Sequence, residues 1–461
     1  MTSIETLTID RPTAAQAEAK QPNPFLTGAH APLTEEFTIE DLPVIGAIPA
    51  ALDGRYLRIG PNPMAADPDN YHWFTGDGMI HGLRLEGGKA LWYRNRWVRS
   101  DAVTTALGEP RTEGPRHLFD TVNTNVLGFA GRTLGLVEAG STPIEIGETL
   151  ETLRYTDFEG TLHGSFTAHP HVDPLTGEMH GICYDAMNPV AIRYVVVTPE
   201  GRVRREVAVP VEHGPMIHDC AITRRFAILL DLPVTFSMET AMAGHPFPYR
   251  WNPSHAARIG LLPREGAAED VIWIETDPCY VFHAVNAYDA EDGQVILDVA
   301  VHDRMFSDGK AGPDSRRTGL ERWTIDPVGR IVRRRVIDTT PQEFPRPDER
   351  RFGLPYRYAY TMQMGAAFLG QGLLKHDLET GARQAHDFGP GRHPGEFVFV
   401  PAHADAGEDE GWLIGIVIDL NEETSELVIL DARDFEGEAV ARVKIPHRIP
   451  PGFHGNWVPR G

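Results

Sequence analysis

Short runs of β-branched and aromatic residues, separated by tight turn signals, recur along the chain from about Gly54 onward. Segments 191–197 and 203–209 form one such pair, and the turn between them contains Pro199, Glu200 and Gly201. Two runs joined in this way are typical of an antiparallel hairpin. The same pattern recurs in 295–301, 413–420 and 426–430. Few segments show a sustained helical period, so the sequence predicts a predominantly β architecture.

These hairpins fill most of the 461-residue chain without a repeat of fixed period. An open sheet of that length would leave unpaired edges, and a propeller avoids them by wrapping four-stranded blades around an axis. The pattern therefore predicts a large closed all-β fold and leaves the number of blades undetermined. Residues 1–27 are polar and aperiodic, so we expect a flexible N-terminal arm there and a single domain over residues 28–461.

Charge and cysteine content narrow the class of protein. The 43 basic and 65 acidic residues give a net charge of −22, which repels phosphate backbones and argues against a nucleic-acid partner. The three cysteines, Cys183, Cys220 and Cys279, have no CxxC spacing and are expected to be reduced thiols. No secretory signal is visible, and the aliphatic stretch 412–420 is too short to cross a bilayer. We expect a cytoplasmic protein without an obligate protein partner.

Four of the 20 histidines lie among apolar or small residues: His169, His218, His283 and His454. An unpartnered imidazole in such surroundings would cost free energy, and imidazole is the commonest metal ligand. Strands that converge on one axis could bring the four rings together. A site made only of imidazoles suits iron, zinc, copper or nickel rather than magnesium or calcium. From the residues alone, iron and zinc both remain open, and His171 is as good a candidate as His169.

Sequence blocks around these histidines resemble the carotenoid cleavage oxygenase family over nearly the full length of the chain. The blocks are 53–63, 73–81, 168–171, 217–219, 282–283, 395–401 and 453–455. Their number and order make the resemblance specific, since each block alone is weak. The resemblance implies a seven-bladed β-propeller whose axial metal site is capped by loops and short helices.

The resemblance also implies an iron(II) centre with a defined set of residues. The implied ligands are His169, His218, His283 and His454. Three glutamates would each support one ligand: Glu138 would support His218, Glu343 would support His283, and Glu396 would support His454. Independently of the family, a metal-bound imidazole needs its other N–H anchored, because that contact fixes its tautomer and orientation.

The activity implied by the resemblance is oxidative cleavage. O2 would be added across one C=C double bond of an apolar polyene, a carotenoid or apocarotenoid, to give two carbonyl products. Such a substrate needs an apolar tunnel, for which the candidate lining residues are Phe74, Trp97, Val137, Phe282, Met362, Phe453 and Trp457. Peripheral membrane contact at the tunnel mouth is a further expectation, with 232–236 and 241–247 as candidate surface segments or a buried lid.

Three alternatives remain open at this level. The first is cleavage of a stilbene or phenylpropenoid by the same iron site. The stilbene-cleaving branch typically has a lysine before the first supporting glutamate and a tyrosine in the upstream strand, whereas this chain has Val137 and, by our alignment, Trp97. The second alternative is isomerisation of a retinyl ester, which would consume no oxygen. The third is a non-catalytic propeller that carries an apolar ligand or docks a protein.

Overall fold

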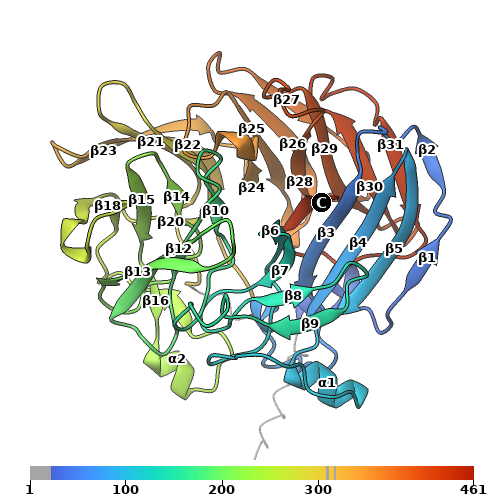
Figure 1. Ribbon diagram of the computed structural model, residues 1–461, viewed down its shortest axis with the longest axis horizontal. Helices are drawn as coiled ribbons and strands as arrows, with labels where there is room; N and C mark the ends of the chain where they lie inside the picture. Colours follow the sequence, from blue (N-terminus) through green and yellow to red (C-terminus); the bar gives the residue numbers. More distant parts are fainter. Residues whose placement is uncertain (1–21, 308–310, 316–317, 461) are drawn as a thin grey trace, which may run out of the picture.

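Seven β-sheets surround a common axis in this computed structural model, which describes residues 22–307, 311–315 and 318–460 (Figure 1). Each sheet has four or five antiparallel strands, and we call these sheets blades 1 to 7 in the order in which the chain forms them from residue 54 onward. The architecture is therefore a seven-bladed β-propeller. This result confirms the all-β prediction from hydrophobic patterning and the seven blades that the family resemblance implies.

The blades have the following strands, each given from the axis outward. Blade 1 contains β32 (Gly455–Pro459), β3 (Gly54–Pro61), β4 (Gly78–Glu86), β5 (Lys89–Trp97) and β1 (Thr38–Glu40). Blade 2 contains β6 (Asn125–Phe129), β7 (Arg132–Leu136), β8 (Ile144–Ile146) and β9 (Thr152–Tyr155). Blade 3 contains β10 (His171–Val172), β11 (Met179–Cys183), β12 (Ala191–Val197) and β13 (Val203–Pro210). Blade 4 contains β14 (Ala221–Ile222), β15 (Phe226–Asp231), β18 (Arg258–Pro263) and β19 (Ile272–Glu275).

The remaining three blades follow the same plan. Blade 5 contains β20 (Tyr280–Asp289), β21 (Val295–His302), β22 (Thr318–Asp326) and β23 (Ile331–Asp338). Blade 6 contains β24 (Gln342–Arg346), β25 (Tyr358–Met364), β26 (Gly370–Asp377) and β27 (Arg383–His386). Blade 7 contains β28 (Arg392–Pro401), β29 (Gly411–Asp419), β30 (Thr424–Asp431), β31 (Ala441–Ile445) and β2 (Val44–Gly46). The hairpins expected at 191–209, 295–301 and 413–430 are thus confirmed.

Blade 1 closes the ring because it combines strands from both ends of the described chain. Residues Gly54 to Arg58 of β3 pair antiparallel with β32, in the register Arg58↔Gly455. This pairing removes the open edge that a linear array of blades would leave. It also places His454, which directly precedes β32, at the axis.

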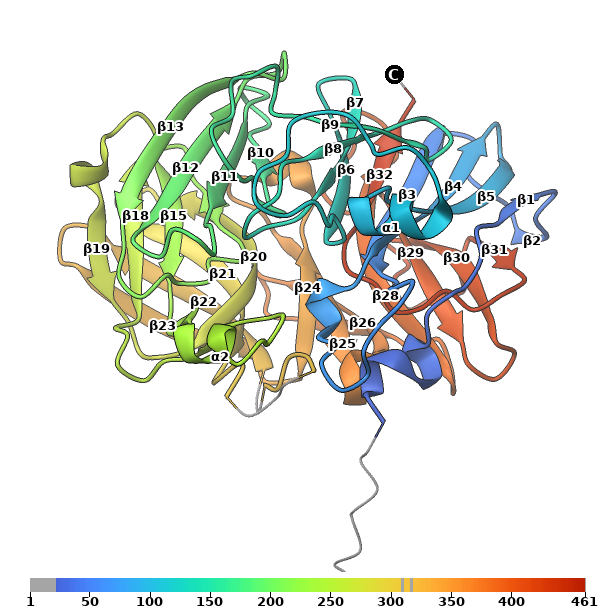
Figure 2. The same cartoon turned by 90° about the horizontal axis from the view of Figure 1, so that it is seen from below.

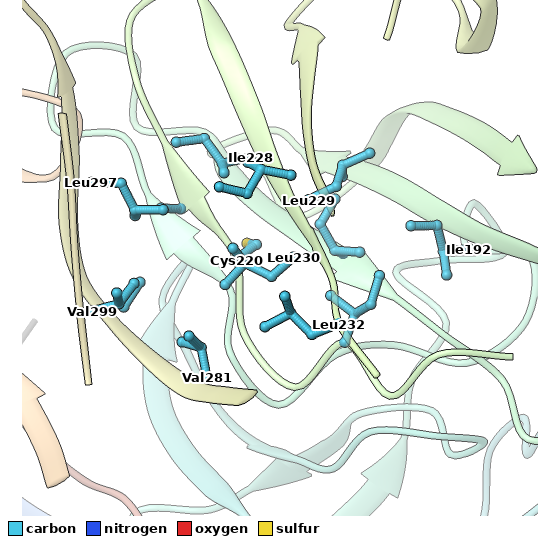
Figure 3. Packing of buried hydrophobic residues seen from close by; sticks show 14 of the residues in the cluster. Ile192, Cys220, Ile228, Leu229, Leu230, Leu232, Val281, Leu297 and Val299 are labelled. Carbon is cyan, nitrogen blue, oxygen red and sulfur yellow. The ribbon is translucent and has the colours of Figure 1, made fainter. Parts of the chain in front are cut away.

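Apolar side chains fill the spaces between neighbouring blades. Figure 3 shows one such layer, in which Ile228 and Leu230 of β15 lie with Leu297 and Val299 of β21. Cys220 lies in the same layer, and all three cysteines are buried free thiols, as expected from their spacing. Burial of this kind, at about 25 cal/mol per Å² of apolar surface, holds blades together that share no hydrogen-bonded ladder.

Short helices and loops cover one side of the ring. Figure 2 places α2 (Met238–Met242) and the N-terminal helical turns on this side. The cap also contains the 3-10 turns η1 (Pro24–Leu26) and η3 (Trp73–Thr75) and the hairpin of β16 (Val234–Phe236) and β17 (Tyr249–Trp251). The other short elements are α1 (Asp101–Leu107), η2 (Gly28–His30), η4 (Ala268–Asp270), η5 (Glu349–Arg351) and η6 (Ala366–Phe368).

The segment expected to be a flexible arm is only partly within the described chain, because residues 1–21 lie outside it. Within the described part of that segment, Phe25 is buried and stacks on Trp73 with ring centroids 4.9 Å apart. The end of the expected arm therefore packs onto the cap. Among the described residues, no helix has the length and apolar character needed to span a membrane.

Candidate metal centre and substrate cavity

Every blade contributes one of the seven expected centre residues within the described chain. The histidines lie at or next to the innermost strands of four blades: His169 before β10, His218 before β14, His283 in β20 and His454 before β32. The glutamates come from the other three blades: Glu138 follows β7, Glu343 lies in β24 and Glu396 lies in β28. Residues that are far apart in sequence therefore meet at the axis.

The four imidazoles converge through their Nε2 atoms. His169 Nε2 is 2.8 Å from His454 Nε2, which is 3.1 Å from His283 Nε2. His218 Nε2 is 3.3 Å from His283 Nε2. One ligand atom from each ring lies within 4.8 Å of the others, and all four rings are buried. The structure therefore brings together the four histidines named from the sequence.

His171, the other candidate in the His-Pro-His segment, lies outside this group. Its Nε2 is 2.8 Å from Asp219 Oδ1, and its ring packs edge-on against Phe352. The geometry therefore favours His169 over His171 as the member of the four-histidine cluster.

The three glutamates anchor the opposite nitrogens of three rings. Glu138 accepts from His218 Nδ1 at 2.7 Å, and Glu343 accepts from His283 Nδ1 at 2.6 Å. Glu396 accepts from His454 Nδ1 at 3.0 Å. With Nδ1–H held by a carboxylate, each Nε2 is left unprotonated and directed at the shared centre. Each expected pairing of glutamate and histidine is present.

Three further polar residues, which the sequence analysis missed, hold these carboxylates in turn. Tyr184 donates to Glu138 Oε1 at 2.8 Å. His302 Nε2 is 2.6 Å from Glu343 Oε1. Arg346 donates from Nε to Glu396 Oε1 at 2.9 Å. Each of these residues is a polar residue within an apolar or proline-rich run, which the sequence shows. The sequence does not show which glutamate each of them contacts.

Burial and these contacts determine the charge of the centre. Burial is the largest influence on Glu138 and opposes its ionisation, but the contacts with His218 and His169 together outweigh burial and lower the pKa of Glu138 to about 2. Burial lowers the pKa of His169, and it lowers the pKa of His454 to about 3. The carboxylates are thus anionic and these imidazoles neutral, which is the state in which imidazole binds a metal ion.

The donor set fits a divalent transition metal. Four neutral nitrogen donors suit iron, zinc, copper or nickel, and the nearby carboxylates compensate the ion's charge without occupying the Nε2 positions. The nearest cysteine, Cys220, lies in an apolar layer, so thiolate ligation is not indicated.

An apolar cavity of about 610 Å³ ends at this centre. Its inner wall includes His218, His283 and His454, and four expected lining residues, Phe74, Val137, Phe282 and Phe453, face it. Further lining comes from the cap, including Trp73, Phe236, Phe247, Tyr249 and Phe368. Phe74 contacts Phe282 and Phe453 edge-on, with ring centroids 6.0 and 5.4 Å apart, beside the histidines.

The structure places three expected lining residues away from this cavity. Trp97 is buried beside Met79 and Val103, and its Nε1 donates to the Asn62 carbonyl at 2.8 Å. Trp457 packs against the core cluster between blades 1 and 7. Met362 is buried between blades 6 and 7, and Met364 on the same strand lines the cavity instead. Trp457 and Met362 fill spaces between blades, and Trp97 packs against α1 and neighbouring loops, so all three contribute to stability rather than to the cavity.

Comparison with known proteins gives a consistent result. The family model described as RPE65, retinal pigment epithelial membrane protein, matches residues 30–459. A carotenoid cleavage oxygenase from Mycobacterium tuberculosis is 42% identical over 501 aligned positions, which cover 97% of this chain and 99% of that protein.

Two solved structures share the architecture. Cobalt-substituted apocarotenoid oxygenase from Synechocystis has a TM-score of 0.84 at 28% identity, covering 95% of this chain and 99% of that one. Lignostilbene dioxygenase from Pseudomonas brassicacearum has a TM-score of 0.86 at 28% identity, covering 96% and 100%. The fold and centre define a propeller enzyme with a four-histidine site. The chain belongs to the carotenoid cleavage oxygenase family, a family of oxidoreductases.

Proposed function

We propose that this protein is an iron(II) dioxygenase that cleaves one C=C double bond of a carotenoid or apocarotenoid. The reaction would consume one O2 and give two carbonyl products, with one oxygen atom in each. The observation that carries the proposal is the convergence of four Nε2 atoms at the end of a largely apolar cavity of about 610 Å³. We further propose that the propeller acts as a single catalytic domain.

In this proposal His169, His218, His283 and His454 hold the ion, and Glu138, Glu343 and Glu396 fix three of those rings. When bound, ferrous iron supplies the redox chemistry that makes O2 reactive toward an alkene. The chain's own task is positioning. Phe74, Phe282 and Phe453 surround the end of the cavity, where they would hold a flat conjugated chain beside the centre and exclude water.

The cavity lining favours a polyene over a phenolic stilbene. Activation of a phenol by proton removal calls for a basic side chain near the hydroxyl. The described lining contains no lysine, and His245 is its one histidine outside the centre and the contacts that support it. Val137, the residue before Glu138, faces the cavity and offers only methyl groups. Trp97 does not affect the choice between polyene and stilbene, because it lies outside the cavity. Stilbene cleavage remains the second candidate, since a lignostilbene dioxygenase shares the fold.

Contact with a membrane surface is supported by the cavity rim. Phe119 and Met187 line the cavity and are 52% and 71% exposed, and Met238 and Met242 of α2 are exposed nearby in sequence to the lining residue Ala241. Of the segments named from the sequence, 232–235 is a buried part of the cap, whereas Phe236 and residues from 241–247 line the cavity. We propose that apolar substrate enters past this rim.

The proposal is tested by anaerobic purification with iron(II), metal analysis, and turnover of a panel of apocarotenals and stilbenes under 18O2. We expect stoichiometric iron and two labelled carbonyl products from a polyene. Conversion of stilbenes alone would favour the second candidate, and an isomerised product without oxygen uptake would reject cleavage. His218→Ala should lose bound iron and turnover together, so normal turnover in that variant would reject the metal assignment.

A further inference from the structure

A second, smaller cavity reaches the histidine cluster from another direction. Its volume is about 90 Å³, and His169, His283 and His454 form its inner end. The large cavity ends at His218, His283 and His454, so the two spaces meet at the same cluster. We call the smaller space the axial chamber. Its rim residues adjoin β6 and β10, which Figure 2 places on the side of the ring away from α2.

The lining of the axial chamber is chemically unlike that of the large cavity. It contains Asn125, His171, Asp219, Arg346, Glu349, Glu396 and Asn456. Three carboxylates thus face one guanidinium, in a protein whose net charge is −22. Arg346 pairs with Glu349 and Glu396, so the charged side chains retain an excess of negative charge, and such an excess concentrates cations. The chamber is therefore suited to a small cation, whereas the large cavity is suited to an apolar molecule.

The chamber reaches the protein surface. Gly128 at its rim is exposed, Leu127 and Val172 are half-buried, and the Glu349 side chain is 50% exposed. Its volume can hold about three water molecules at roughly 30 Å³ each, which is enough for a partly hydrated ion but not for a polyene.

His171 and Asp219 form a polar pair on the way to the cluster. Together with Cys220 they are a second group whose potential ligand atoms lie within 4.8 Å of one another. The imidazole and carboxylate of this pair line the chamber, whereas Cys220 does not. The pair is joined by a hydrogen bond of 2.8 Å between His171 Nε2 and Asp219 Oδ1. Oxygen and imidazole donors of this kind bind a divalent ion that has lost part of its water.

We infer that the axial chamber is the entrance by which a hydrated divalent metal ion reaches the four histidines, with His171 and Asp219 as its first protein ligands. This inference rests on the metal centre of the proposed function. The alternative path runs through the large, mostly apolar cavity, where stripping water from a doubly charged ion with few polar replacements carries a large desolvation penalty. Metal ion and organic substrate would thus enter from different directions.

Metal uptake by apoprotein tests the inference without requiring turnover. The metal is removed with a chelator, cobalt(II) is added, and binding is followed by visible absorbance in a stopped-flow instrument. Val172→Trp narrows the rim, His171→Leu removes the polar ligand, and Glu349→Lys reverses the charge at the mouth. We expect each to slow uptake by about tenfold or more, with the final cobalt content unchanged. Glu349→Gln, which keeps the side-chain length near Arg346, should have a smaller effect in the same direction.

Two control variants introduce the same kinds of change, added bulk and charge reversal, on the side of the large cavity. Met187→Trp adds the same bulk at the rim of the large cavity, and Glu239→Lys reverses an exposed charge on α2. Both should load cobalt at the wild-type rate, and Met187→Trp should raise the KM for polyene. Wild-type uptake rates in Val172→Trp and Glu349→Lys, or slow uptake in Met187→Trp, would overturn the inference. Failure of the wild-type protein to bind cobalt would instead reject the metal centre itself.

Discussion

Tyr184 donates its phenolic hydrogen to Glu138 Oε1 over 2.8 Å, the same oxygen that accepts from His218 Nδ1 over 2.7 Å. The tyrosine is 4% exposed and lines the large cavity. Tyr184 therefore connects the cavity wall, through one carboxylate oxygen, to a proposed metal ligand. His302 contacts the other oxygen of Glu343 from the one that holds His283, and Arg346 shares Glu396 Oε1 with His454, so each of the three carboxylates has a second donor.

Tyr184→Phe removes one of these donors and keeps the ring. The Glu138 carboxylate then holds His218 with one contact fewer, so we expect metal affinity to fall by about three- to tenfold. Loss of a direct partner of a ligand typically costs 10- to 100-fold. Competition titration with a chelator measures the change. Tyr249→Phe, which removes a hydroxyl from the same cavity, should leave affinity unaltered, and equal losses in both variants would contradict a specific role for Tyr184.

Glu343→Gln keeps the size of the side chain but removes its negative charge. Glutamine keeps a single, uncharged acceptor oxygen, so either His283 Nδ1 or His302 Nε2 loses its acceptor and neither contacts an anion. We expect turnover to fall by about 10- to 100-fold with the fold retained, as judged by circular dichroism. Glu422→Gln, at an exposed turn, is the matched control. Full activity with Glu343→Gln would show that His283 needs no anionic support.

Val137→Lys introduces a basic group beside Glu138 at the cavity wall. We expect it to lower polyene turnover by roughly tenfold, because an ammonium group is unfavourable in an apolar cavity. Cleavage of a phenolic stilbene should increase relative to cleavage of a polyene, since the amine can accept the phenol's proton. Val137→Met adds comparable length without a base. It should lower polyene turnover without raising stilbene cleavage relative to polyene cleavage. An identical substrate ratio in both variants would mean that this position does not select the substrate.

The three cysteines should be inert in the folded protein. Burial raises the pKa of Cys183 and of Cys279 to about 12, and it raises that of Cys220 as well. The thiolate is the reactive form, so a thiol reagent should label none of them at pH 8 until denaturant is added. Because these values exceed the unfolded value of about 9.0, the thiols' contribution to stability is complete below pH 9.

That contribution is then lost as the pH rises from 9 toward 12, since only the unfolded chain releases the protons there. Denaturant titrations at pH 8 and pH 10 measure this loss, and Cys279→Ala should reduce it. Rapid labelling of native protein at pH 8 would show that one of the thiols is accessible.

The hairpins and the four histidines could be predicted from the sequence, but the wall of the cavity could be predicted only in part. Period-two runs and turn residues act locally, so β12 and β13 were found within one residue of their observed ends. Phe74 and Trp97 look alike as aromatic residues near strand ends. Which of them faces the cavity depends on where a blade meets the cap, and that relation joins segments far apart in the chain.

The choice between His169 and His171 has the same origin. Both rings are buried polar groups in one three-residue segment. Only the partner from another blade distinguishes them, which is His454 for His169 and Asp219 for His171. Tyr184 and Arg346 went unnoticed because the carboxylates that they hold come from other blades. The geometry of the site depends on contacts between blades. Sequence patterns reflect only the strands within a single blade, so they do not predict those contacts.

The pairing of β3 with β32 has a consequence for biosynthesis. His454 directly precedes the strand that completes the circle, whereas the other three histidines come from blades formed earlier along the chain. In a folding intermediate in which β32 has not yet paired with β3, His454 is not held at the axis. Such an intermediate has three ligand nitrogens in position and should bind the metal weakly. A metal ion bound by all four histidines would then stabilise the closed ring relative to the open one. Metal occupancy would therefore distinguish fully folded molecules from those in which the ring is still open.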